Sequence, residues 1–67
     1  MLSLDPYKVY SINIWLPDTS TVLEEIAVGS SVERAVRDAQ SKYSNYTRIV
    51  VFDADTKDAV AIFKPNK

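Results

Sequence analysis

Two stretches near the end of the chain, residues 48–53 and 58–64, carry apolar side chains on both faces of the strands that they predict. Successive side chains of a strand point to opposite sides of the sheet, so a strand with one solvated side alternates apolar with polar residues. A continuous apolar run instead indicates a strand that is covered on both sides. The chain offers one helical stretch as cover, so the second face needs the chain termini or another molecule.

The size and composition of the chain narrow what else can stabilise it. Its 67 residues predict one domain, residues 1–67, near the lower size limit for a self-sufficient hydrophobic core. Such small domains usually gain stability from disulfides, metals or association. Because the chain has no cysteine and no histidine, we expect no disulfide, no metal and no cofactor. The remaining source of additional stability is association with a protein.

The charge is balanced, with 8 basic and 9 acidic residues and a net charge of −1. Such a balance gives no strong field to attract nucleic-acid backbones or anionic lipid. The sequence has no secretory start and no apolar run near the roughly 18 residues of a membrane span. We therefore expect a cytoplasmic (intracellular) protein that binds no membrane. Its length alone favours an assembly subunit or small inhibitor, of the kind that viruses and mobile elements encode.

Periodicity and turn residues predict five elements after a lead-in at residues 1–6, where Asp5-Pro6 marks a turn. Ser30 and Glu33 fit a capping box at the start of the helix. The order ββαββ indicates an α+β fold with one helix packed on one face of a four-stranded sheet. The strands are expected at about residues 7–16, 21–28, 46–53 and 59–64, and the helix at about 31–43.

The first two thirds of the chain also follow a known pattern. Ile12-Asn13-Ile14-Trp15-Leu16-Pro17 precedes a short polar turn and Thr21-Val22, and Gly29-Ser30-Ser31-Val32 opens a helix with Ala35, Val36 and Ala39. This pattern resembles the opening of ubiquitin-like β-grasp domains, and the small-GTPase-binding members are nearest. The resemblance implies a mixed sheet of order 2-1-4-3, with the last strand parallel to the first and a right-handed crossover through the helix.

The chain departs from that β-grasp pattern in three ways. It lacks the extra short strand and long connection before the last strand, and it does not end in a diglycine tail. Its second strand carries Glu24 and Glu25 where GTPase binders present basic residues. The resemblance therefore implies the fold and an adaptor role, but not the partner.

The last hairpin predicts which side chains form the surface away from the helix. If Asp53 faces Asp58 across a four-residue turn, regular alternation divides the two strands into two apolar faces. Ile49, Val51, Val60 and Ile62 then share one face, and Val50, Phe52, Ala59, Ala61 and Phe63 share the other. The predicted interface comprises Tyr7, Val9, Trp15, Arg48, Val50, Phe52, Ala61 and Phe63.

This surface favours a non-enzymatic protein-protein interaction module: a homodimer or larger homo-oligomer, an adaptor or a small inhibitor. The alternative is single-stranded nucleic acid, with bases stacked on Trp15, Phe52 and Phe63 beside the cation of Arg48.

Residues 49–56 also look like the strand-ending aspartate motif of haloacid-dehalogenase-type phosphatases, but the threonine comes one position early and only eleven residues follow Thr56. A cation site built from Asp53, Asp55 and Asp58 lacks the glycine and glutamate of an EF-hand and contains Lys57. The simpler interpretation is that these aspartates accept backbone hydrogen bonds in a hairpin turn. No nucleophile is paired with a base, so the sequence predicts no enzyme.

Overall fold

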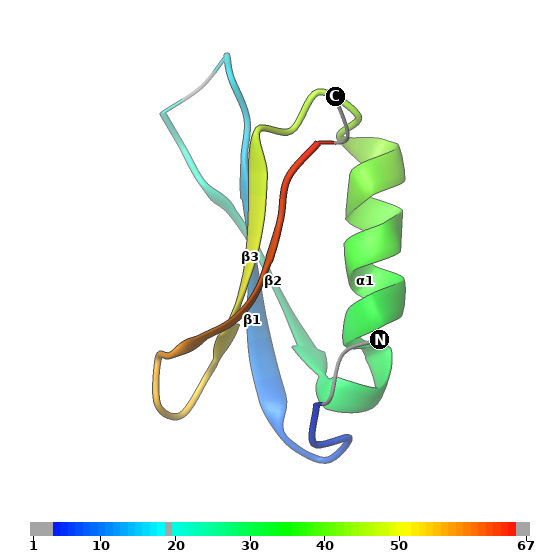
Figure 1. Cartoon of the computed structure of the whole chain (residues 1–67), viewed down its shortest axis with the longest axis vertical. Helices are drawn as coiled ribbons and strands as arrows, with labels where there is room; N and C mark the ends of the chain where they lie inside the picture. The colour runs from blue at the N-terminus through cyan, green and yellow to red at the C-terminus, as the bar shows by residue number, and fades with distance from the viewer. Residues whose placement is uncertain (1–3, 19, 66–67) are drawn as a thin grey trace.

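A computed structural model describes residues 4–18 and 20–65 and contains, within them, four strands and one helix. The elements are β1 (Val9–Trp15), β2 (Leu23–Val28), α1 (Gly29–Lys42), β3 (Arg48–Asp53) and β4 (Ala59–Phe63). The strands form one sheet, and α1 lies on one side of it (Figure 1). The predicted α+β class and the ββαββ order are confirmed. Residues 1–3 of the predicted lead-in lie outside the described residues.

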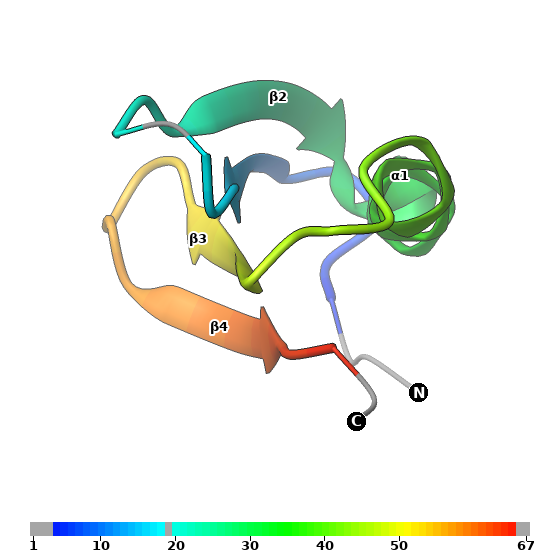
Figure 2. The same ribbon diagram turned by 90° about the horizontal axis from the view of Figure 1, so that it is seen from above.

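The predicted strand order 2-1-4-3 and the mixed sheet are wrong. The sheet has the order β2-β1-β3-β4, and every neighbouring pair is antiparallel (Figure 2). Since β2 and β3 are both antiparallel to β1, they run in the same direction on either side of it, and α1 connects them as a split βαβ unit. The parallel central pair that the β-grasp resemblance implies is therefore absent from the described sheet.

Two physical features favour this order. Antiparallel ladders are slightly more stable per residue than parallel ones, and this order makes all three ladders antiparallel. The short connection after α1 also leads directly to the free edge of β1, where the Thr47 N–H donates to the Trp15 carbonyl oxygen at 2.8 Å. The strand that follows therefore pairs with β1, and β4 takes the outer edge.

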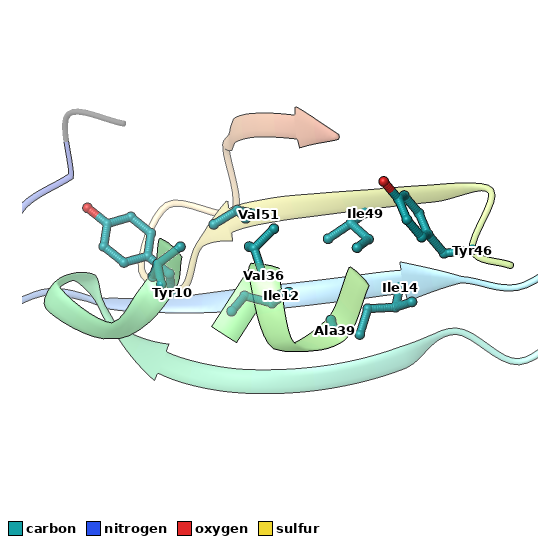
Figure 3. Packing of buried hydrophobic residues seen from close by; sticks show 9 residues of the cluster. Tyr10, Ile12, Ile14, Val36, Ala39, Tyr46, Ile49 and Val51 are labelled. Carbon is teal, nitrogen blue, oxygen red and sulfur yellow. The ribbon is translucent and has the colours of Figure 1, made fainter. Parts of the chain in front are cut away.

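The core lies between α1 and the two central strands. Ile12, Ile14, Ile49 and Val51 are fully buried on the side of the sheet that faces α1. The helix contributes Val32, Val36 and Ala39, whose spacing places them on one helical face. Figure 3 shows this cluster, with Tyr10 and Tyr46 at its two ends.

The two tyrosines at the ends of the core form hydrogen bonds to neighbouring segments of the chain through their hydroxyl groups. Tyr10 Oη accepts a hydrogen bond from the Asp5 N–H at 3.2 Å. Tyr46 Oη accepts one from Gln40 Nε2 at 3.2 Å and donates to the Lys64 carbonyl oxygen at 3.3 Å. Each buried ring thus has a polar partner, and the chain before β1 and the end of β4 are tied to the core.

The helix begins at Gly29, so the capping box predicted at Ser30 is wrong. Val28 occupies the N-cap position and its side chain makes no capping hydrogen bond. The first N–H groups of the helix instead donate to backbone carbonyls: Gly29 to Lys8 at 2.8 Å and Ser30 to Pro6 at 3.4 Å. The turn predicted at Asp5-Pro6 is present and supplies the acceptors that a helix start requires.

Gly29 is essential to this junction because the turn passes directly over its Cα. A Cβ at this position would overlap the Asp5 carbonyl oxygen and lie 2.7 Å from the carbonyl carbon. We expect Gly29→Ala to lower the free energy of unfolding by about 1–3 kcal/mol, the usual cost of overpacking. Chemical denaturation measures it, with Ser41→Ala on the exposed helix face as a control that changes stability by less than about 0.5 kcal/mol. Equal stability of Gly29→Ala and wild type would contradict the close approach.

Candidate interaction surface

The side of the sheet that faces away from α1 is the candidate site, and we call it the outer face. Its residues follow from the pairing register, because alternate side chains of each strand point away from the buried set. The outer face consists of Val9, Ser11, Asn13 and Trp15 on β1, Glu24, Ile26 and Val28 on β2, Arg48, Val50 and Phe52 on β3, and Ala59, Val60 and Ile62 on β4.

The outer face exposes large aliphatic side chains. Ile26 is 62% exposed and Ile62 is 59% exposed, and Val9, Val28 and Val60 are each exposed by about two fifths. Together with Tyr7, these are the exposed large hydrophobic residues of the described part of the chain. The helix covers one side of the sheet, and these exposed aliphatic side chains lie on the other side.

At its turn end, the β3–β4 hairpin has the predicted register. The Asp53 N–H donates to the Asp58 carbonyl oxygen and the Lys57 N–H donates to the Asp53 carbonyl oxygen, each at 2.8 Å. Phe52 lies opposite Ala59, as expected from a four-residue turn. Lys57 closes the turn with a positive φ of 67°.

A β-bulge then shifts the register between Val51 and Phe52. Val51 pairs with Ala61 and not with Val60, and Ile49 pairs with Phe63. A bulge places one extra residue in one strand, and a shift of one residue moves every later side chain to the other face. The predicted placement of Ala61 and Phe63 on the outer face is therefore wrong, because both pack against the core cluster on the helix side.

Five of the eight predicted interface residues do lie on the outer face: Val9, Trp15, Arg48, Val50 and Phe52. Val50 is only 5% exposed, so its side chain packs beneath its neighbours and adds little to the accessible surface. Tyr7 lies in the turn before β1 and is 91% exposed.

The sequence prediction missed Ile26, Val28, Val60 and Ile62. For β2 the glutamates give no usable signal, because each face carries one: Glu24 shares its face with Ile26 and Val28, and Glu25 lies opposite Ile12 on the helix side. For β4 no such signal exists, since every residue of that strand is apolar.

One end of the outer face carries a stacked pair. Trp15 on β1 lies directly opposite Arg48 on β3, and the guanidinium carbon is 4.2 Å from the centroid of the indole ring. A cation over an aromatic face is attracted by the ring quadrupole. The contact holds the half-buried ring of Trp15 beside the exposed positive charge of Arg48.

A shallow groove runs over β1 between Ile26 on β2 and Phe52 on β3. Its floor is formed by the small polar residues Ser11 and Asn13, and Glu24 lines one side. Asn13 Nδ2 donates to Ser11 Oγ at 3.0 Å, and Ser11 Oγ donates to Glu24 Oε2 at 2.5 Å. These bonds give the Ser11 hydroxyl and the Asn13 amide nitrogen partners within the chain.

Asp53 organises the hairpin turn, which is the role expected from the turn interpretation. Its Oδ1 accepts the N–H of Asp55 at 2.8 Å and that of Thr56 at 3.3 Å, and its Oδ2 pairs with Lys8 Nζ at 2.5 Å. The hydrogen bond from Lys8, helped by that from Asp55, lowers the pKa of Asp53 below its ordinary 3.8. The same hydrogen bond raises the pKa of Lys8 above 10.5.

The described residues contain no group of three or more acidic side chains that could hold a metal ion, so Asp53, Asp55 and Asp58 do not converge on one point. Within residues 4–18 and 20–65, no helix is long and apolar enough to cross a membrane.

Comparisons with protein-family models, with curated proteins and with solved structures give no match to this chain.

The Lys8–Asp53 pair predicts how stability depends on pH. Asp53 has a lowered pKa when folded, so its contribution is present above about pH 3.8 and is lost as pH falls through the folded value. Lys8 has a raised pKa, so its contribution is present below about pH 10.5 and is lost as pH rises through the folded value. Asp53→Asn keeps an oxygen for the turn and removes the charge. We expect this variant to be less stable at neutral pH, with a deficit that shrinks at both extremes.

Denaturation across the pH range measures this difference, with Asp55→Asn in the same exposed turn as the control. A deficit for Asp53→Asn that stays constant from acid to neutral pH would contradict a folded-state charge pair.

Proposed function

We propose that this protein is a non-enzymatic protein-protein interaction module that binds through the outer face. The observation that carries the proposal is the position of Val9, Ile26, Val28, Val60 and Ile62, which are all exposed and all on that face. Contiguous exposed apolar surface of more than a few hundred Å² marks interaction sites in soluble proteins. An antiparallel sheet with a purely solvated side would carry polar residues there instead.

Two further features support a protein as the ligand. Trp15 and Phe52 stand among the aliphatic residues, and aromatic side chains are the usual anchors of protein interfaces. The Ser11 hydroxyl and the Asn13 amide nitrogen on the groove floor already donate hydrogen bonds within the chain, so a protein can cover these donors at little cost. A surface that is apolar at its edges and has hydrogen-bonded donors at its centre is suited to burial against another protein.

Replacement of Ile26 tests this proposal. Ile26→Lys puts a charge into the exposed apolar surface, and Ser41→Lys adds the same charge on the exposed side of α1. We expect Ile26→Lys to lose a bound protein, or self-association, that wild type and Ser41→Lys retain. The measurement combines affinity capture from the native cells with sedimentation of each purified chain. If Ile26→Lys is folded and behaves like Ser41→Lys in both assays, the outer face is not the binding surface.

Single-stranded nucleic acid is the second candidate, and the Trp15–Arg48 stack favours it. Aromatic rings beside a cation are what sequence-tolerant single-strand binders use to stack bases, and Trp15 with Arg48 is such a pair. On this reading, Arg48→Ala and Trp15→Ala each weaken binding of a short labelled oligonucleotide, and Arg48→Ala also flattens its salt dependence. Fluorescence anisotropy at two salt concentrations measures both effects. No binding by wild type at low salt would exclude this candidate.

A further inference from the structure

The outer face is low along β1 and higher on both sides of this strand. Over β1 the floor is low, because Ser11 and Asn13 are small and lie in the groove, and Ile26 on β2 lines one side of it. Over β3 and β4 the surface carries the larger side chains of Phe52, Val60 and Ile62. A trough therefore lies beside a ridge on one face of one chain.

The two halves also differ in charge. The β2 side carries Glu24, which lies on the outer face. The β3 and β4 side carries Arg48, and Lys64 follows two residues after Ile62. Opposite charges across an interface set register and exclude wrong arrangements. A surface whose central strands, β1 and β3, complement each other in shape, and whose two halves differ in charge, fits a second copy of itself.

We propose that two copies of this chain pack outer face to outer face, about a two-fold axis that runs along the strands between β1 and β3. This inference rests on the proposed function and names the partner as a second copy. The axis places β1 of one copy over β3 of the other, and β2 over β4. Homodimers with such a two-fold interface are the commonest soluble oligomers, and aligned sheets pack in this way in β-sandwiches.

The strand register determines which residues of the two copies then meet. Ser11 and Phe52 are paired neighbours across the axis, so Phe52 of one copy enters the trough above Ser11 of the other. At the next level Glu24, Asn13, Val50 and Ile62 lie in one row across the sheet. Glu24 of one copy therefore meets the end of β4 in the other, beside Lys64.

A dimer interface of ordinary size would need the whole outer face. A stable interface buries about 800 Å² on each partner, which is about one sixth of the 4665 Å² that this chain exposes. The molecule measures 33 × 22 × 16 Å, and the sheet and the helix lie side by side along its intermediate dimension, so the outer face spans the longest and the shortest dimensions (Figure 1). The net charge of −1 adds little repulsion between copies.

A charge exchange between Glu24 and Lys64 tests the proposal. Sedimentation velocity from micromolar to millimolar concentration is expected to show a monomer–dimer equilibrium for wild type. Glu24→Lys alone and Lys64→Glu alone each bring like charges together at two symmetric places, so each is expected to weaken the dimer about tenfold or more. An equimolar mixture of the two variants restores both opposite-charge pairs, and we expect its dimer to approach wild-type affinity.

Asp38→Lys and Arg34→Glu change the net charge equally on the exposed face of α1 and serve as matched controls. A wild type that stays monomeric at millimolar concentration overturns the proposal, and so does a mixture that dimerises no better than either variant alone. Dimers that dissociate equally in the control variants overturn it too. If the chain is monomeric and a different protein is captured in an Ile26-dependent manner, this inference fails while the proposed function stands.

Discussion

Within the described residues, a single helix of fourteen residues has to cover a sheet whose last two strands, β3 and β4, are apolar on both sides, and the rest of the structure follows from that constraint. The helix packs mainly over β1 and β2, where its apolar stripe meets Tyr10, Ile12 and Ile14. Nothing in the described residues covers the opposite side of the sheet, so Ile26 and Ile62 remain in contact with solvent. The fold thus separates a packed core from an apolar surface without a partner in the described residues. We propose that the protein binds through that surface.

The β-bulge in the last hairpin determines which side chains of β4 pack against the core and which lie on the outer face. It directs Phe63 and Ala61 toward the core and leaves Val60 and Ile62 outside. The aromatic ring therefore fills the space beside Ile49 that the helix does not reach, while branched aliphatic residues extend the outer face to the edge of the sheet. Bulges are common in edge strands, where they also make edge-to-edge pairing less regular.

The sequence predicts the parts of this fold whose signals are local. Alternation fixes the core face of β1, the helical period of Val32, Val36 and Ala39 fixes the buried side of α1, and Asp53 marks the turn. Strand order was not predictable, because β3 and β4 are equally apolar and either suits the place beside β1. The bulge was not predictable for the same reason: a register shift changes nothing in a pattern that is apolar on both faces. The helix start depends on carbonyls of Pro6 and Lys8, which no local capping motif encodes.

The neighbouring residues Ile62 and Phe63 allow the most direct test of the account, because they lie on opposite faces of one strand. The measurement is the free energy of unfolding of Ile62→Glu and Phe63→Glu, at a chain concentration where both are monomeric. The account predicts a change of less than about 0.5 kcal/mol for Ile62→Glu, as for other surface sites. It predicts a loss of more than about 2 kcal/mol, or failure to fold, for Phe63→Glu, because the carboxylate would enter the core. A tolerated Phe63→Glu together with a disruptive Ile62→Glu would contradict the account.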